Sequence, residues 1–183
     1  MDSGISFHVD ATNGSSRRLG VKIEIDGPFT ENILELRFPR WVPGSYFIRE
    51  PIQHMSDLSA TCDGKNAKIK RVDVDGARIT GVSGASKIVV TYRLLAAEMT
   101  CRANHLDDSH VHIMPPYTWM MPTRGIEKSR MDQTHKVTLA APKEWNTATQ
   151  LSDKEGEWFK GLKQRIQGAA DAYNRSRGVP SPQ

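Results

Sequence analysis

The sequence contains few cysteines and no long hydrophobic run. Among its 183 residues the cysteines are Cys62 and Cys101, too few for a disulfide framework or for a zinc site built from cysteines. Each lies in a strand-like run, which favours a buried, reduced thiol, with a single disulfide as the open alternative. No stretch approaches the roughly 18 apolar residues of a membrane span, so no membrane partner is expected. No signal peptide is visible, which favours a cytoplasmic location.

Motifs of the common enzyme classes are also missing. No two histidines four residues apart enclose a glutamate, the pattern that places two zinc ligands and a general base on one helix face. The sequence has neither a Gly-x-Ser-x-Gly nucleophile elbow nor a glycine-rich phosphate loop. We therefore predict that this chain alone is not an enzyme and that it has no catalytic residue, no resident metal and no cofactor.

Basic residues are not concentrated in any part of the chain. The formal net charge is +4, from 25 basic and 21 acidic residues, and both signs are dispersed along the sequence. A nucleic-acid footprint needs a basic patch or stripe, whereas a dispersed excess is typical of a solvated surface. We therefore expect no nucleic-acid partner.

What the chain does contain is a series of short alternations of apolar and polar residues, separated by turn residues. Ile5, Phe7 and Val9 alternate with polar neighbours, as in a half-buried strand. Strands are expected over 5–9, 21–25, 33–38, 58–62, 67–74, 77–82, 88–94, 111–114 and 135–140. Because no helical pattern intervenes, residues 1–151 are predicted to form a mainly β, antiparallel, sandwich-like domain.

The C-terminal residues follow a different pattern. Ser152 to Glu155 match a capping box, and the apolar residues that recur at helical spacing are Trp158, Leu162, Ile166, Ala169 and Tyr173. This predicts one amphipathic α-helix over 152–178 and a disordered tail over 179–183. Such a helix is marginal alone, so its apolar stripe should be buried. We favour a homodimer through this helix. Docking within the same chain and a free or membrane-surface helix are the alternatives.

The first motif that suggests a site is rich in aromatic residues and spans 40–50. Pro43-Gly44 forces a turn directly after an apolar strand. Trp41 and Tyr46 flank this turn, and Arg49 is suited to bind a carboxylate with two hydrogen bonds. One interpretation is a rigid corner in which Trp41 is buried, so that its truncation costs about 3–5 kcal/mol. The other is a loop that lines a substrate cleft.

The second motif holds three histidines and two aspartates between residues 105 and 112. We favour a polar loop in which Arg102, Asn104, Asp107 and His110 are hydrogen-bonded to one another and bind no metal. The alternative is a small metal-binding protein or metal-dependent enzyme that uses Asp107, His110 and His112. On a strand, His110 and His112 would share a face. That site would need a further ligand, either His54 or His135.

Together with a third segment, these motifs resemble a known domain. Trp41-x-Pro43-Gly44-Ser45-Tyr46-x-Ile48-Arg49 is similar to a signature of the N-terminal domain of PDZ-containing glycyl aminopeptidases, peptidase family sixty-one of the gluzincin zinc metallopeptidases. The stretch from Val90 to His110 resembles that domain's second signature. Pro142-x-x-Trp145-x-x-Ala148-Thr149 resembles the segment that closes the domain. The resemblance covers roughly Ile5 to Leu151.

The resemblance implies a β-domain that packs against a thermolysin-like catalytic domain and helps to bound its cleft. No zinc ligand or general base of the family has a matching position here, and the sequence departs from the pattern after Leu151. We therefore expect a non-catalytic binding or interaction module, or a part of a larger peptidase, whose partner is a second copy or a catalytic metallopeptidase domain. The candidate ligand-binding or cleft-lining residues are Trp41, Tyr46, Arg49, Arg102, Asn104, Asp107 and His110.

Overall fold

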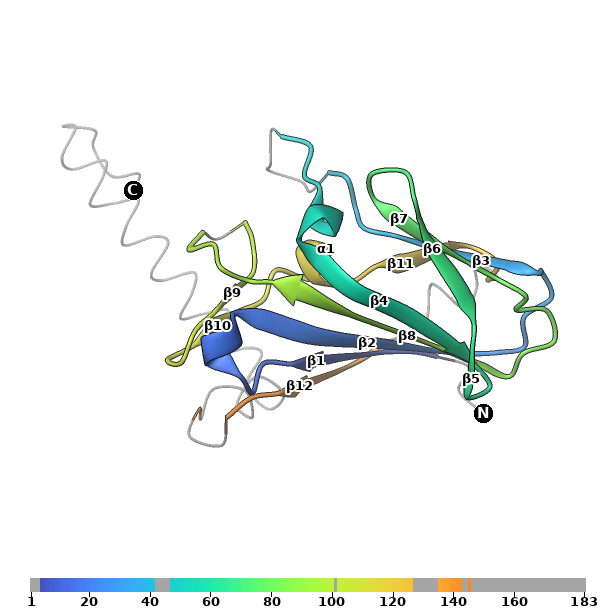
Figure 1. The fold of residues 1–183 in the computed structure, drawn as a ribbon, viewed down its shortest axis with the longest axis horizontal. Helices are drawn as coiled ribbons and strands as arrows, with labels where there is room; N and C mark the ends of the chain where they lie inside the picture. The colour runs from blue at the N-terminus through green and yellow to red at the C-terminus, as the bar shows by residue number, and fades with distance from the viewer. Residues whose placement is uncertain (1–3, 42–46, 101, 127–134, 143–144, 146–183) are drawn as a thin grey trace, which may run out of the picture. The chain divides into compact units, whose positions relative to one another are not determined.

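The structure is a computed structural model that describes residues 4–41, 47–100, 102–126, 135–142 and 145. Strands dominate this part of the chain (Figure 1). They are β1 (Ile5–Asp10), β2 (Arg18–Asp26), β3 (Ile33–Arg37), β4 (Met55–Cys62), β5 (Lys65–Asn66), β6 (Lys68–Val72), β7 (Gly76–Thr80), β8 (Lys87–Leu95), β9 (His105–Leu106), β10 (Val111–His112), β11 (Met121–Arg124) and β12 (Lys136–Ala140). The helical turns are η1 (Gly14–Ser16), η2 (Pro51–His54) and α1 (Pro115–Thr118). Within the described residues no helix is long and apolar enough to cross a membrane.

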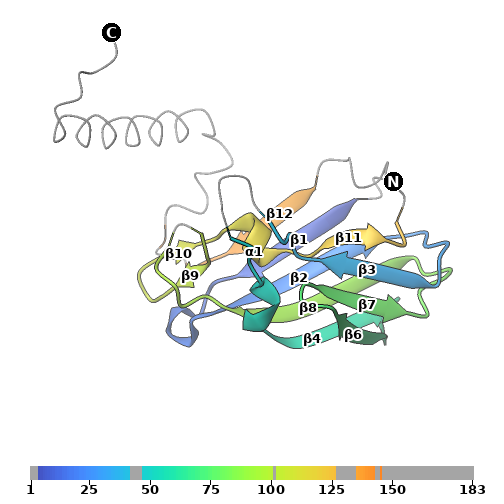
Figure 2. The ribbon, with the colours of Figure 1, turned by 90° about the horizontal axis from the view of Figure 1, so that it is seen from above.

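Hydrogen bonds between strands form three sheets. A six-stranded sheet has the order β12-β1-β2-β8-β4-β5, a four-stranded sheet has the order β11-β3-β7-β6, and β9 pairs with β10. Figures 1 and 2 show the four-stranded sheet packed over one face of the six-stranded sheet. The pairs are antiparallel except β1 with β12, which run parallel. The predicted mainly β fold with antiparallel sheets is therefore confirmed, apart from this one pair.

The core consists of alternate side chains of the long strands. In β2 the buried side chains are Leu19, Val21, Ile23 and Ile25, and in β8 they are Ile88, Val90, Tyr92 and Leu94. The two strands pair without a register shift, from Arg18 opposite Leu95 to Asp26 opposite Lys87. Because side chains alternate between the two faces of a strand, all of these apolar groups lie on one face. The alternation in the sequence thus identifies the buried face correctly.

Most strands differ from their expected bounds by one to three residues, and for two of them the reason is local. β4 begins at Met55 instead of residue 58, and it contains an irregularity near Asp57, whose φ is 54°. A bulge of this kind breaks the alternation from which the strand was predicted. The strand expected over 111–114 is shortened because two prolines follow Met114 and begin α1. Proline has no N–H for a strand ladder but fits the first turn of a helix.

Several predictions fall outside the described residues. They concern the helix over 152–178, the tail over 179–183, the domain boundary at Leu151 and the homodimer through the helix, and all of them stay predictions.

Of the two cysteines, Cys101 lies outside the described residues. Cys62, at the end of β4, has a free and half-buried thiol, and burial raises the pKa of this thiol. The thiol of Cys62 is free, but it is half-buried and not buried as we expected.

Candidate functional site

The ends of the aromatic loop, residues 40–49, are held firmly against the four-stranded sheet. The main-chain N–H of Arg49 donates to the carbonyl of Arg40 at 3.1 Å, which closes the loop at its base. The Asp75 carboxylate accepts from Nε of Arg40 at 2.6 Å and from Nη1 of Arg37 at 2.7 Å. The Arg40 hydrogen bond and both positive charges lower the pKa of Asp75, against the effect of burial. The base of the loop is therefore fixed by a buried carboxylate that lies 35 residues further along the chain.

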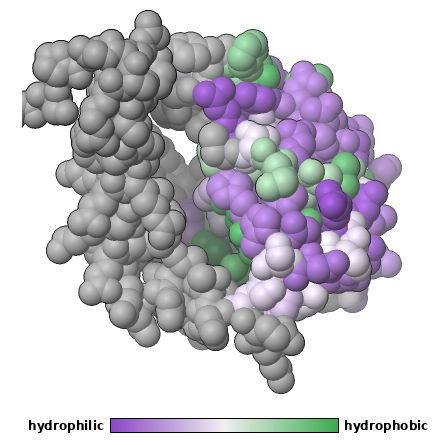
Figure 3. Space-filling view, turned by 90° about the vertical axis from the view of Figure 1, so that its left-hand side faces the viewer, coloured by the Kyte–Doolittle hydropathy of each residue, from purple (hydrophilic) through white to green (hydrophobic). Residues whose placement is uncertain are grey.

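The described apolar side chains of this loop are exposed. Trp41 is 59% exposed, Phe47 66% and Ile48 71%. Figure 3, which looks at the end of the domain that carries β9 and β10, shows a mainly hydrophilic surface with several hydrophobic patches, one of them at its upper edge. The Arg49 guanidinium lies 5.7 Å from the centroid of the Phe47 ring, within cation–π range. The loop thus presents apolar groups from an anchored base.

The prediction that Trp41 is buried in a rigid corner is wrong. The aromatic residue that fills the core at this end is Phe38, which is 2% exposed and meets the Tyr92 ring edge-on with centroids 6.0 Å apart. The sequence continues through Arg40, whose side chain is bound to Asp75, and Trp41 comes after this anchor. Tyr46 lies outside the described residues, so its packing stays a prediction.

Substitution of Trp41 by alanine is therefore expected to change the free energy of unfolding by less than about 0.5 kcal/mol, the usual range for a surface position. Substitution of Phe38 by alanine is the matched comparison and should cost about 3–5 kcal/mol, because it removes a buried ring. Urea unfolding of both variants measures the difference. A loss for Trp41→Ala comparable to that for Phe38→Ala would mean that the indole is covered in solution.

Asn104 belongs to the core. It is 5% exposed. Its Oδ1 accepts from the main-chain N–H of Met114 at 2.8 Å and from Oγ1 of Thr118 at 2.9 Å, while its Nδ2 donates to the carbonyl of Tyr117 at 3.2 Å. These bonds tie the segment before β9 to α1. The role of Asn104 is therefore structural, and its side chain is not available to a ligand.

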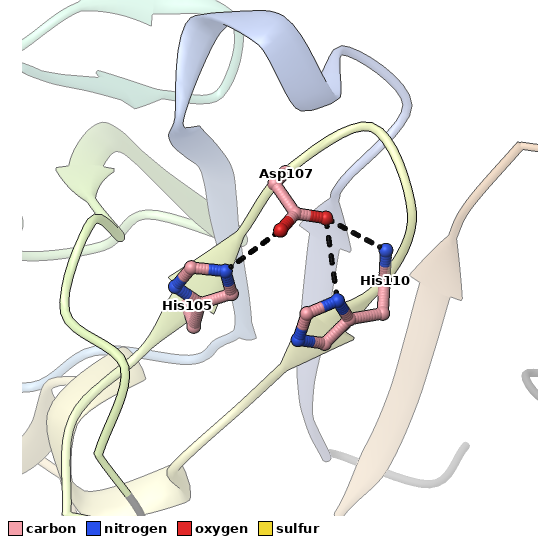
Figure 4. A group of neighbouring side chains, drawn as sticks. All are labelled: His105, Asp107 and His110. Atoms are coloured by element: carbon pink, nitrogen blue, oxygen red, sulfur yellow. Dashed lines mark hydrogen bonds and ion pairs between the residues drawn. The ribbon is translucent and has the colours of Figure 1, made fainter.

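Asp107 organises the turn between β9 and β10, which we call the histidine turn (residues 105–110; Figure 4). Its Oδ1 accepts from the N–H of Ser109 at 2.8 Å, from Oγ of Ser109 at 2.7 Å and from the N–H of His110 at 3.0 Å. Its Oδ2 is 3.1 Å from Nε2 of His105. These hydrogen bonds, with that of Ser109 the largest, hold the pKa of Asp107 well below its usual range. The group is thus a carboxylate at any physiological pH.

The two histidines of the turn lie against each other. The rings of His105 and His110 are stacked, with centroids 4.9 Å apart and an interplanar angle of 29°. His105 is buried and its Nδ1 has no hydrogen-bond partner, whereas Nδ1 of His110 is 3.3 Å from Oδ1 of Asp107. One ligand atom from each of His105, Asp107 and His110 lies within 4.8 Å of the others. Among the described residues, these three side chains form the one group that could hold a metal ion.

The structure separates residues that the sequence suggested would lie together. Asp107 and His110 share hydrogen bonds as expected, but Asn104 points to α1, and the one contact described for Arg102 joins its main-chain N–H to Oγ1 of Thr100 at 3.1 Å. The expectation of a single cluster of all four is therefore wrong. The physical reason is that α1 supplies partners for Asn104 and takes it out of the turn.

The residues that the structure brings together differ from those that the sequence suggested for a metal site. His112 is exposed and does not belong to the group of neighbouring ligand atoms. His54 is 3.7 Å from Glu98, and His135 packs edge-on against Phe7, so neither supplies a further ligand. The residue that the sequence reasoning missed is His105. In a two-residue strand, alternation is too short to show that the His105 side chain is buried.

Comparison with known proteins identifies the family to which this domain is similar. The family model described as the peptidase M61 N-terminal domain matches residues 6–169. The match continues beyond Leu151, where the resemblance in the motifs ended, so the departure that we expected after Leu151 is not seen up to residue 169. A search of curated proteins finds no match.

Solved structures show a similar fold. A crystal structure of an aminopeptidase N family protein from Idiomarina loihiensis matches 76% of this chain at 21% sequence identity, with a TM-score of 0.66. The chain covers 22% of that protein. A two-domain M1 zinc metallopeptidase, solved as a mutant bound to L-tryptophan, matches 59% of this chain and 26% of its own at 8% identity, with a TM-score of 0.35. That second similarity is too low to support an inference about the fold.

Proposed function

The chain belongs to the family of the peptidase M61 N-terminal domain, and from this premise we propose that it is a non-catalytic module that binds a catalytic metallopeptidase domain through its aromatic loop. The observation that carries the proposal is the exposure of Trp41, Phe47 and Ile48 on one anchored loop. Exposed apolar groups that gather in one place are typical of interaction sites, and aromatic residues contribute strongly to binding energy.

The anchoring of the loop supports a role in binding. The Arg40–Asp75 ion pair and the hydrogen bond between Arg49 and Arg40 fix the loop at both ends before any partner arrives. Binding therefore costs less conformational entropy than it would for an unrestrained loop. The arginines at the two ends add a polar rim to the apolar centre, which is the usual anatomy of a protein interface.

The length of the relatives suggests the kind of partner. This chain covers 22% of the Idiomarina loihiensis protein, and the family resemblance implies that a catalytic domain lies next to this domain. The proposed occupant of the loop is that domain, with Trp41 and Arg49 at the boundary of its cleft. Arg102 and His110 are proposed as residues near the same surface, and Tyr46 as part of the loop.

A binding experiment tests this function. The probe is the catalytic domain of a family sixty-one aminopeptidase expressed without its own N-terminal domain, mixed with the full chain in sedimentation velocity and calorimetry. We expect a one-to-one complex with a Kd of about 10 µM or tighter. The combined Trp41→Ser, Phe47→Ser and Ile48→Ser variant should bind at least about tenfold more weakly, which corresponds to about 1.4 kcal/mol.

The control is Val137→Ser, because Val137 is an exposed apolar residue of β12 outside the loop, with 53% of its surface accessible. It should leave the affinity unchanged. Equal affinity of the loop variant and the control, or no complex at about 100 µM, would contradict the proposal.

The second proposed partner is another copy of this chain. Sedimentation of the full chain alone tests it, because a dimer through the helix predicted over 152–178 would have twice the monomer mass.

A further inference from the structure

We propose that His105, Asp107 and His110 bind one divalent transition-metal ion of the zinc class. These side chains come from β9 and from the turn that follows it, and Figure 4 shows both rings beside the carboxylate. One ligand atom from each lies within 4.8 Å of the others. Two imidazoles and one carboxylate form a set of three protein ligands that zinc accepts, with a fourth position left for water.

Each imidazole lies close to the carboxylate, but each faces a different oxygen of it. Nε2 of His105 is 3.1 Å from Oδ2 of Asp107, and Nδ1 of His110 is 3.3 Å from Oδ1 of Asp107. With zinc–ligand bonds of about 2.0–2.2 Å, two atoms on a tetrahedral centre lie about 3.3–3.5 Å apart. An ion held by both rings therefore binds through both carboxylate oxygens or moves one ring toward the oxygen that the other ring faces.

The main chain holds the carboxylate in place. Oδ1 of Asp107 accepts two main-chain N–H groups, from Ser109 and His110, so the orientation of the carboxylate is fixed by the turn. Its Oδ2 is directed toward His105. A Cβ built on Gly14 would lie 2.3 Å from the carbonyl oxygen of Asp107, so the η1 turn packs directly on this backbone. Ligands held in this way lose little freedom when an ion binds.

The two rings differ in exposure, and together they suit a site that solvent can reach. The His105 side chain is 4% exposed and that of His110 is 49% exposed. The stacking of the rings fixes the buried imidazole, whose Nδ1 has no partner in the protein. The nitrogen that faces Asp107 is Nε2, so the ring already presents a ligand atom on the side of the carboxylate.

The donor atoms select the class of metal. Imidazole nitrogen favours zinc, copper and nickel, whereas magnesium and calcium prefer sites made of oxygen atoms alone. With two nitrogens and one carboxylate, the site should accept Zn²⁺ and reject Ca²⁺. The zinc titration uses this chain alone, so its result does not depend on the proposed binding of a peptidase domain.

Calorimetry on the full, untagged chain tests the site, after chelator treatment and desalting. Titration with Zn²⁺ near neutral pH should give one site per chain with a Kd of about 1 µM or tighter. Titration with Ca²⁺ should give no binding heat. A rise in the melting temperature with added Zn²⁺, absent with Ca²⁺, is the second expected result, because an ion that binds only the folded state stabilises it.

Three variants locate the ion. His110→Ala, at the half-exposed position, and Asp107→Asn, which keeps an acceptor for the turn, should each weaken Zn²⁺ binding by at least about tenfold. His112→Ala is the matched control, because His112 is exposed and lies outside the group. It should leave the affinity unchanged. Circular dichroism of each variant confirms that it is folded before the comparison.

A spectroscopic signature adds a readout that affinity alone does not give. Co²⁺ in place of Zn²⁺ should show the visible absorption of a four-coordinate ion in the wild-type chain and in His112→Ala, and should lose it in His110→Ala. No stoichiometric Zn²⁺ binding at about 100 µM would overturn the proposal. Equal affinity of the wild-type chain and His110→Ala, or loss of binding in His112→Ala, would overturn it as well.

Discussion

Replacement of Asn104 by alanine is expected to lower the free energy of unfolding by about 3 kcal/mol, because it leaves two polar groups without partners. The main-chain N–H of Met114 and the carbonyl of Tyr117 each lose a bond to the amide, at 2.8 and 3.2 Å. The Thr118 hydroxyl loses one acceptor but keeps its bond to the carbonyl of Met114 at 2.9 Å, so it adds less. Each unsatisfied buried group costs about 1–3 kcal/mol.

Urea unfolding followed by tryptophan fluorescence measures this loss. The neighbouring variant Arg102→Ala is the matched control, because Arg102 is exposed and its described bond comes from its main-chain N–H, which alanine keeps. It should change stability by less than about 0.5 kcal/mol. If the two variants are equally stable, the amide network around α1 does not contribute to the folded state.

The sequence predicts the long strands well because their pattern has one dominant cause. β2 and β8 each bury one face, so apolar residues must alternate along them, and the alternation is readable without the structure. The aromatic loop shows the limit of that reasoning. Phe38 continues the buried alternation of Leu34 and Leu36, whereas Trp41 lies beyond the end of the strand, where no alternation applies. The contact that anchors this segment joins Arg40 to Asp75, a residue that sequence proximity does not connect with the loop.

The histidine turn shows a second limit. Local spacing correctly indicated that Asp107 and His110 would interact, since a carboxylate commonly accepts from residues two and three positions later. The position of His105 depends on the pairing of β9 with β10 and on the packing of both under neighbouring turns. Strands of two residues are too short for a period to be recognised. The candidate site could therefore be only partly predicted from the sequence.

Replacement of Asp75 by asparagine is the second change with a large expected effect. Its carboxylate is almost fully buried and binds Arg37 and Arg40, whose guanidinium groups carry like charges. Asparagine keeps the shape but removes the charge that both arginines share. We expect a loss of about 2–3 kcal/mol in the free energy of unfolding. This is less than the 3–5 kcal/mol for breaking a fully buried pair, because both arginines reach water.

The dependence of this loss on pH distinguishes the charge from the shape of the side chain. In the folded state the Arg40 hydrogen bond and the two positive charges lower the pKa of Asp75, whereas its unfolded value is about 3.9. The ion pairs therefore stabilise the fold above about pH 4, and this contribution is lost as the pH falls through the lowered pKa of the folded state. The difference in the free energy of unfolding between wild type and Asp75→Asn should be full at pH 7 and become smaller in acid.

The control Asp73→Asn removes only an exposed partner of Arg37, at 3.0 Å, and should cost less than about 1 kcal/mol. If the stability difference between wild type and Asp75→Asn is unchanged in acid, or if Asp75→Asn and Asp73→Asn lose equal stability, the buried charge does not hold the base of the aromatic loop.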